Sequence, residues 1–197
     1  MYRRKDAYYA KAKKEGYRSR AAYKLLELAS SERIAGPGDF VVDAGAAPGG
    51  WSQVLLRLVG KGGKVAAVDL LPMDPVPGEN FRFFRGDLTD RSLSDGILAF
   101  FGRRADAVVS DAAPNTTGVP FADQARSADL VRSVHALARE SLREGGILLA
   151  KIFEGAEVDD VVAELRSSFG SVRRIRPAAT RKESFELYLL ARGFRRT

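Results

Sequence analysis

Residues 41–53 decide the fold of this chain, and they read Val41-Val42-Asp43-Ala44-Gly45-Ala46-Ala47-Pro48-Gly49-Gly50-Trp51-Ser52-Gln53. The apolar run 40–42 predicts a buried strand that ends at Asp43, and a loop of small residues follows it. A helical pattern then starts near Gly50, with an apolar face formed by Val54, Leu55, Leu58 and Val59. Strand, glycine-rich turn and helix form the opening of a βαβ nucleotide-binding unit, in which glycines let a ligand approach the backbone.

The residues of this loop distinguish between kinds of nucleotide site. A phosphate-binding NTPase loop ends in Gly-Lys-Ser or Gly-Lys-Thr, but no lysine follows Gly49-Gly50. A dinucleotide site has the spacing G-x-G-x-x-G, whereas residues 43–50 have the pattern D-x-G-x-x-P-G-G. The loop therefore favours an adenosine-bearing ligand without phosphates, and S-adenosylmethionine is the cofactor that we expect. The alternative is a tight turn that serves only the fold.

Length and composition are those of one globular domain. The 197 residues are enough to bury a core, and 45% hydrophobic with 29% charged residues is ordinary for a soluble protein. The absence of cysteine excludes a disulfide framework and a thiolate metal site. No secretory signal and no apolar run near 18 residues is present, so we expect a cytoplasmic protein that does not cross a membrane.

Positive charge is concentrated near the N-terminus. The formal net charge is +7, and residues 1–33 alone hold ten Lys/Arg against four Asp/Glu, which gives that segment +6. Tyrosines are interleaved with these cations, and unpaired RNA bases can stack on aromatic rings; they are Tyr2, Tyr8, Tyr9, Tyr17 and Tyr23. We therefore expect residues 1–33 to form a basic arm and helix that bind RNA, as part of the same domain as residues 34–197. The alternative is a solvated helix face.

Predicted strands and helices alternate along the chain. A short basic helix over 6–15 ends at Gly16, and Ser19 is the expected N-cap of a helix that runs to Ser31. Later strands are expected at 64–68, 81–85, 105–110 and 147–153, later helices beyond Asp90, over 123–143 and over 158–168, and a hairpin-like pair at 172–175 and 185–190. This order predicts a doubly wound, mostly parallel α/β sheet, to which the C-terminal pair adds an antiparallel edge strand.

Aspartates follow several of the predicted strands. Asp69 lies 20 residues beyond Gly49, where α/β nucleotide sites place the acid that accepts hydrogen bonds from ribose hydroxyls. Asp87 could accept from an adenine amino group, or its charge could serve the N-terminus of the next helix. Asp111 precedes a polar, proline-broken loop. Ligands in such sheets bind beyond the carboxyl ends of the strands, so we expect these acids and residues 45–51 to form one site.

Two charged residues interrupt apolar strands. Lys151 lies within the predicted strand 147–153, and Glu186 lies within 185–190. Because lysine is rarely buried without a partner or a function, Lys151 is a candidate functional residue. The single histidine, His135, falls inside a predicted helix and is expected to pack or to face solvent rather than to catalyse.

With these residues in view, the chain from Tyr9 to Gly193 resembles the FtsJ family of ribose 2′-O-methyltransferases that act on large-subunit ribosomal RNA. The resemblance rests on five segments: 19–21, 43–53, 69–75, 110–115 and 186–188. It implies a Rossmann-like class I methyltransferase fold, a methyltransferase domain over 34–197, and S-adenosyl-L-methionine as the cofactor. Two departures are Ala112, where we expect methionine, and Phe185, where an arginine is common; the second bears on how RNA meets the site.

The resemblance also implies a set of site residues. The family's lysine–aspartate–lysine–glutamate tetrad falls on Lys24, Asp111, Lys151 and Glu186. The expected cofactor contacts are Gly49, Trp51, Asp69, Asp87 and Asp111, to which we add neighbours from the same loops, Gly45, Pro48, Gly50 and Leu88. No metal is expected to take part.

The implied activity is 2′-O-methylation of a ribose, with a uridine of 23S rRNA in the assembled large subunit as the expected target and a monomer as the active form. Lys151 would either remove the hydroxyl proton as a neutral base or orient the hydroxyl as an ammonium, because two cations and two anions leave its state open. Transfer RNA as the substrate and a non-catalytic RNA-binding assembly factor remain alternatives. A nicotinamide oxidoreductase is disfavoured by the loop spacing, and base methylation by the absence of cysteine.

Overall fold

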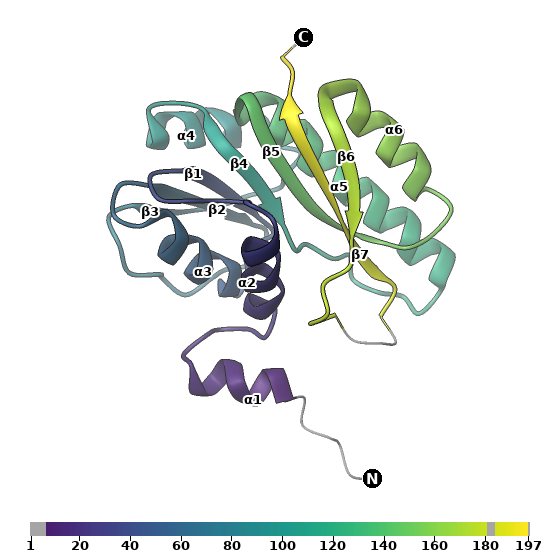
Figure 1. The fold of residues 1–197 in the computed structure, drawn as a ribbon, viewed down its shortest axis with the longest axis horizontal. Coiled ribbons are helices and arrows are strands. Elements are labelled where there is room, and N and C mark those ends of the chain that lie inside the picture. The colour runs from purple at the N-terminus through teal and green to yellow at the C-terminus, as the bar shows by residue number, and fades with distance from the viewer. Residues whose placement is uncertain (1–6, 181–183, 197) are drawn as a thin grey trace.

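The computed structural model describes residues 7–180 and 184–196, and within them one sheet lies between two layers of helices (Figure 1). The sheet is seven-stranded, with the order β3-β2-β1-β4-β5-β7-β6. Among strands β1 to β5, each strand runs parallel to the neighbours with which it pairs, as the doubly wound prediction requires. The strands are β1 (Phe40–Ala44), β2 (Lys64–Asp69), β3 (Phe81–Arg85), β4 (Ala105–Ser110), β5 (Leu142–Phe153), β6 (Phe169–Ile175) and β7 (Glu186–Phe194).

The C-terminal pair adds antiparallel strand pairing at one side of the sheet, as predicted, and its interior member is β7. It pairs antiparallel with β5 on one side and with β6 on the other, so β6 forms the edge. The burial pattern explains this order. Residues 187–191 of β7 are all buried, as an interior strand requires, whereas in β6 only Phe169 is buried and four of the seven residues are exposed.

Each face of the sheet is covered by its own helices. Helices α2 (Ala22–Ser31) and α3 (Gly50–Val59) pack on one face, with Leu25, Leu28 and Leu55 in the core. Helices α4 (Ser92–Phe101), α5 (Pro120–Ser141) and α6 (Val158–Ser168) cover the other face. The short helix α1 (Ala7–Lys14) lies below α2 and α3, away from the sheet (Figure 1). In the described part of the chain, no helix is long and apolar enough for a transmembrane span.

Two helix boundaries differ from the sequence expectation. The N-cap of α2 is Ala21 rather than Ser19, because residues 19–21 already form a turn in which the Ser19 carbonyl accepts from the Ala22 N–H. Helix α5 begins at Pro120, three residues before the expected Asp123, with proline at its first position, where a missing N–H costs nothing. It ends at Ser141 rather than at residue 143, because β5 begins at Leu142.

Two of the N-terminal aromatics have a structural role. Tyr17 and Tyr23 are buried and pack edge to face, and the Tyr23 hydroxyl donates to Glu15. They belong to the core, so the expectation that they stack on RNA bases was wrong for these two. Tyr2 lies outside the described residues. His135 lies on α5 and packs against Phe169 of β6, and burial lowers the pKa of His135, which fits the packing role expected of it.

Candidate active site

The sheet topology explains how residues from distant parts of the chain meet at one edge. Parallel strands β4 and β5 end at the same side, which places Asp111, just after Ser110, next to Lys151 across the pairing Ser110↔Ala150. Because β7 runs antiparallel to β5, it begins where its neighbours end. Its first residue, Glu186, therefore lies at this carboxyl edge, and Tyr188 pairs with Lys151.

Lys24, Asp111, Lys151 and Glu186 form one ion-pair cluster, hereafter the tetrad. Lys24 Nζ donates to Glu186 Oε2 at 2.7 Å and lies 3.8 Å from Asp111 Oδ1. Lys151 Nζ lies 3.1 Å from Asp111 Oδ1 and 3.8 Å from Glu186 Oε1. It also donates to the Asp111 carbonyl oxygen at 2.7 Å. The two cations thus face the two anions, and each lysine lies close to both carboxylates.

The tetrad is almost closed to solvent. The side chains of Lys24 and Lys151 are only 7% and 6% exposed, and those of Asp111 and Glu186 are 15% and 21% exposed. Burial by itself raises the pKa of Glu186, but the hydrogen bond from Lys24 and the charges of both lysines outweigh it and hold the pKa below its ordinary value. Glu186 is therefore an anion at neutral pH. A polar molecule entering here would meet fixed charges rather than bulk water.

Tyr188 supports the tetrad and was not among the predicted site residues. Its hydroxyl donates to Asp111 Oδ1 at 2.6 Å, and burial together with the Asp111 charge raises its pKa well above the ordinary value. Its ring stacks on Trp51, with 5.9 Å between centroids. A signal was present in the sequence: Tyr188 is two residues beyond Glu186 in a strand, so both side chains point to the same face.

A hollow of about 350 Å³ adjoins the tetrad at Asp111, and we call it the acidic hollow. Its volume is in the range of small-molecule sites. Its lining brings together several predicted residues, Gly45, Asp69, Asp87, Leu88 and Asp111. Three of these are carboxylates, and among the described residues neither a lysine nor an arginine lines the hollow. Such a lining disfavours phosphates and suits a ligand that carries positive charge.

Asp69 ties together the loops that bound the acidic hollow. Its Oδ2 accepts from the Ala47 N–H and its Oδ1 from the Leu71 N–H, both at 2.8 Å. Gly45 lets the loops after β1 and β4 touch: its φ is +76°, and an added Cβ would lie 2.5 Å from the Ala112 Cβ. A larger residue there would push the two loops apart.

The other predicted cofactor residues of the first loop lie outside the lining of the acidic hollow. Trp51 is buried and its indole N–H donates to the Ala21 carbonyl, so its ring serves the tetrad through Tyr188. Pro48, Gly49 and Gly50 lead into α3, whose first N–H groups have no partner within the helix and so could meet a ligand through the backbone.

Arg18 holds this loop in place and was also missed from the sequence. Its guanidinium donates to the carbonyl oxygens of Pro48, Asp74 and Pro75, at 3.3, 2.6 and 2.7 Å. Gly49, whose φ is +105°, leaves room for the Arg18 guanidinium, because an added Cβ would lie 2.9 Å from Arg18 Nη1. Although Arg18 belongs to the basic N-terminal segment, it joins two loops of the domain.

Asp87 has a local structural contact. Its Oδ1 accepts from the Thr89 N–H and hydroxyl, each at 2.9 Å, and these bonds lower its pKa. This contact orders the turn before α4, whose N-cap is Arg91. Asp87 also lines the acidic hollow, and its Oδ1 carries both of these hydrogen bonds. The contact with adenine stays a prediction.

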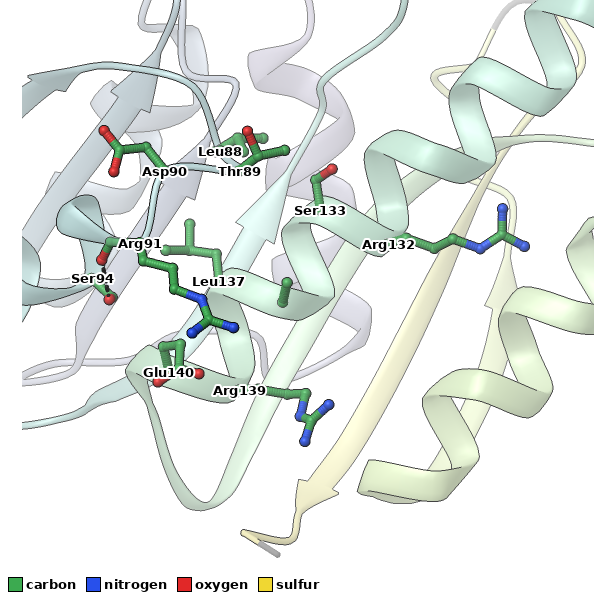
Figure 2. A pocket seen from close by; sticks show the side chains of 11 residues that line it. Leu88, Thr89, Asp90, Arg91, Ser94, Arg132, Ser133, Leu137, Arg139 and Glu140 are labelled. Atoms are coloured by element: carbon green, nitrogen blue, oxygen red, sulfur yellow. Dashed lines mark hydrogen bonds between the residues drawn. The ribbon is translucent and has the colours of Figure 1, made fainter.

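A second hollow of about 430 Å³ lies beside the acidic hollow, between the turn before α4 and helix α5 (Figure 2). It shares Leu88 and Ser133 with the acidic hollow but includes no member of the tetrad. Arg132 points away from Arg91 toward α6, where it forms ion pairs with Glu157 and Glu164 (Figure 2). The larger hollow is therefore remote from the charged cluster.

Asp43 is a buried acid beneath the site. Burial raises its pKa to about 7, and the charges of Asp111 and Asp69 add to the rise, although Ser52 Oγ donates to its Oδ2 at 2.6 Å. The folded protein thus keeps this proton up to about pH 7, whereas the unfolded chain releases it near 3.8. Stability from this group is complete below pH 3.8 and is lost as the pH rises toward 7, by an amount on the order of 4 kcal/mol.

We therefore expect Asp43→Asn to flatten the pH dependence of the unfolding free energy between about pH 4 and 7. The amide cannot ionise, so the variant should lose less stability than the wild type on going from pH 5 to pH 8. Urea denaturation at both pH values measures this difference. Asp160→Asn, at an exposed position on α6, is the control. Parallel profiles for Asp43→Asn and the wild type would contradict the expectation.

Fold and site together define a Rossmann-like class I methyltransferase, with a mostly parallel sheet and one inserted antiparallel strand. The chain belongs to the FtsJ-like methyltransferase family, whose model matches residues 17–194. It is 49% identical to the ribosomal RNA large subunit methyltransferase E of Methanothermobacter thermautotrophicus, over 98% of this chain and 92% of that protein.

Two further comparisons agree. The ribosomal RNA large subunit methyltransferase E of Marinobacter nauticus is 47% identical, over 96% of this chain and 91% of that protein. A crystal structure of a Plasmodium falciparum protein described as a ribosomal RNA methyltransferase superposes with a TM-score of 0.80 at 27% identity. That match covers 90% of this chain and 98% of the other.

Proposed function

We propose that this chain transfers a methyl group from S-adenosyl-L-methionine to a ribose 2′-hydroxyl of large-subunit ribosomal RNA. The observation that carries the proposal is that a buried Lys–Asp–Lys–Glu cluster and an acidic hollow share Asp111 at one sheet edge. The names of the relatives support the choice of RNA over other acceptors, since two of them at 49% and 47% identity are large-subunit ribosomal RNA methyltransferases.

The acidic hollow fits this cofactor by charge. S-adenosylmethionine carries a sulfonium and an ammonium but no phosphate, and the hollow presents Asp69, Asp87 and Asp111 without a cation among its described lining residues. Asp69 and Asp87 would hold the ribose and adenine, and Asp111 belongs both to this hollow and to the tetrad. When bound, the cofactor supplies an electrophilic methyl group whose leaving sulfur departs neutral.

The residues of the chain then have to prepare the hydroxyl. Lys151 Nζ is held by the Asp111 carbonyl oxygen at 2.7 Å and by Asp111 Oδ1 at 3.1 Å, so these two contacts set the direction in which its remaining position points. In this proposal it orients the 2′-hydroxyl and stabilises the charge that develops on the oxygen while the carbon–oxygen bond forms, the methyl–sulfur bond breaks and the hydroxyl proton is released to water. Lys24 and Glu186 hold the other side of the cluster. Holding hydroxyl and methyl donor in line can supply on the order of 7–11 kcal/mol of the barrier reduction.

Methyl transfer to isolated large ribosomal subunits tests the proposal. Subunits from a strain that lacks this protein should accept radiolabelled methyl groups. After alkaline hydrolysis of the RNA, the label should remain in dinucleotides, because a methylated 2′-oxygen cannot attack the adjacent phosphodiester. Label on transfer RNA alone would favour the transfer RNA alternative. No label on either, with intact RNA binding, would favour the non-catalytic assembly factor.

Cofactor choice gives a second prediction. Asp69→Ala should weaken S-adenosylmethionine and S-adenosylhomocysteine binding by roughly tenfold or more, because it removes a ribose acceptor and frees the Ala47 and Leu71 N–H groups. Calorimetry measures the effect. Asp74→Ala, in the loop that follows β2 but outside the hollow's lining, should bind normally. Binding of NAD in preference to S-adenosylmethionine would overturn the cofactor assignment.

The basic arm supplies the RNA surface in this proposal. Lys13 and Lys14 are exposed on α1, and removing one lysine–phosphate interaction should reduce the log–log salt slope of RNA binding by roughly 0.7–0.9. We expect Lys13→Gln/Lys14→Gln to raise KM for the ribosomal subunit and to flatten its salt dependence, with cofactor affinity unchanged. Lys61→Gln, an exposed lysine in the turn before β2, is the control. If Lys13→Gln/Lys14→Gln and Lys61→Gln have the same salt slope of RNA binding, the arm is only a solvated face.

A further inference from the structure

A third hollow adjoins the tetrad at Glu186. It has a volume of about 320 Å³ and includes that carboxylate, whereas the acidic hollow includes Asp111. We call it the Phe185 hollow; its other lining residues are Thr116, Gly118, Pro120, Asp123, Gln124, Phe153, Ser184 and Phe185. The charged cluster therefore borders two cavities and contributes one carboxylate to each.

The Phe185 hollow is chemically unlike the acidic hollow. Phe153, Phe185 and Pro120 give it flat, apolar walls. Its two carboxylates are already engaged: Asp123 accepts from Thr117 and the Gly118 N–H, and Glu186 accepts from Lys24. What remains for a ligand is an aromatic surface with a few neutral polar groups, because both carboxylates already accept hydrogen bonds from the protein.

One of these polar groups is an unused amide. Gln124 has no hydrogen-bond partner within the part of the chain that the structure describes, although it lies against the rim of a charged cluster. Its side chain packs against Gly155, where an added Cβ would lie 2.5 Å from Gln124 Cδ. A side-chain amide offers both a donor and an acceptor, which is the pairing that the edge of a nucleobase requires.

Exposed apolar side chains gather around the same two cavities. The exposed large hydrophobic residues of the described chain are Leu70, Leu71, Val119, Phe121 and Phe185. Leu70 and Leu71 line the acidic hollow, Phe185 lines the Phe185 hollow, and Val119 and Phe121 flank its Pro120. The ring of Phe185 is exposed while its backbone is fixed, since its carbonyl accepts from the Glu154 N–H at 2.7 Å.

Covalent geometry links the Phe185 hollow to the reaction. A nucleobase is attached to the ribose carbon next to the one that bears the 2′-hydroxyl. When that hydroxyl lies at Lys151, the base must lie beside the tetrad, in a cavity that the cofactor does not fill. The acidic hollow suits a cationic cofactor, which leaves the cavity with aromatic walls for the base.

We propose that the Phe185 hollow binds the unpaired nucleobase of the nucleotide that is methylated, with the base stacked on Phe185 and its edge facing Gln124. This inference rests on the proposed ribose methylation and adds to it the acceptor subsite. It also gives a role to Phe185, the position at which the sequence departs from the arginine that is common there.

The test compares two phenylalanines of similar exposure. Phe185→Ala should raise KM for large ribosomal subunits about tenfold, with kcat changed less than about threefold and cofactor affinity unchanged, because base stacking is removed and the tetrad is not. Phe121→Ala is the matched control: its ring is 72% exposed against 68% for Phe185, but it does not line the hollow. Its KM should stay within about threefold of the wild type.

A conservative variant separates stacking from a structural role. Phe185→Trp keeps an aromatic face and should restore KM to within a few-fold of the wild-type value, and thermal unfolding of both Phe185 variants should match the wild type because the ring is exposed. Unchanged KM in Phe185→Ala, or equal impairment of Phe185→Ala and Phe185→Trp, would overturn the subsite. Failure of the proposed function looks different, since then the wild-type protein itself would transfer no methyl group.

Discussion

Lys151→Ala should lower kcat for methyl transfer by at least about a hundredfold, while cofactor affinity changes by no more than a few-fold. A positioned proton-transfer or charge-stabilising group contributes typically 10²–10⁴-fold. Lys151 is 6% exposed and contacts Asp111 through both its carbonyl and its carboxylate, so no water can take its place with the same geometry. It does not line the acidic hollow, which is why we expect donor binding to survive.

Lys64→Ala is the matched control for this variant. Lys64 also lies within a strand of the sheet and donates to a backbone carbonyl, that of Phe100 at 2.8 Å, but it is at the amino end of β2. Single-turnover kinetics with saturating cofactor would separate the chemical step from RNA binding. A decrease of less than about tenfold in Lys151→Ala, worth about 1.4 kcal/mol, would show that the lysine is peripheral.

Asp111→Ala should give the largest loss of stability among the site variants, about 3–5 kcal/mol, because it leaves two buried ammonium groups with one carboxylate between them. Lys24 and Lys151 lie 3.8 and 3.1 Å from Asp111 Oδ1, and the Tyr188 hydroxyl donates to the same oxygen at 2.6 Å. All three partners would lose an acceptor at once. Denaturant titration of the purified protein measures the change.

An exposed aspartate provides the comparison. Asp129 forms an ion pair with Arg132 at 3.0 Å but its side chain is 72% exposed, so Asp129→Ala should alter stability by less than about 1 kcal/mol. A double variant, Asp111→Ala with Lys24→Met, should be more stable than the sum of the two single changes predicts, because the unpaired cation is gone. Strict additivity would mean that the charges in the tetrad are not coupled.

The fold was predictable because residues 41–53 place a strand, a glycine turn and a helix in sequence, and the rest of the chain repeats that alternation. The strand order at the C-terminal side was not predictable in the same way. Both 172–175 and 185–190 have strand patterns, but which of the two inserts next to β5 depends on burial across the completed sheet. Local propensity carries no information on that choice.

Residues that act through long-range contacts were the ones missed. Arg18 looked like one more cation of a basic segment, yet its acceptors lie 30, 56 and 57 residues further along the chain. The cofactor contact of Trp51 stays a prediction, and the stacking of its ring on Tyr188 was not foreseen because it depends on β7 bringing that tyrosine under the tetrad. Lys151 and Glu186 could be singled out because a charged residue is conspicuous in an apolar strand, whereas Lys24 and Asp111 were assigned to the tetrad through the family resemblance.

The tetrad joins Lys24 to Glu186, which are 162 residues apart, and Glu186 begins β7, which follows the other six strands of the sheet along the chain. A nascent chain that has formed β1 to β5 therefore has its donor cavity but lacks half of its anionic charge, and Lys24 has not yet met the carboxylate that it binds at 2.7 Å. In the proposed mechanism, the tetrad is complete only when β7 has inserted between β5 and β6. Polypeptides that end before β7 should therefore not modify RNA, and they also leave the edge of β5 that β7 covers unpaired.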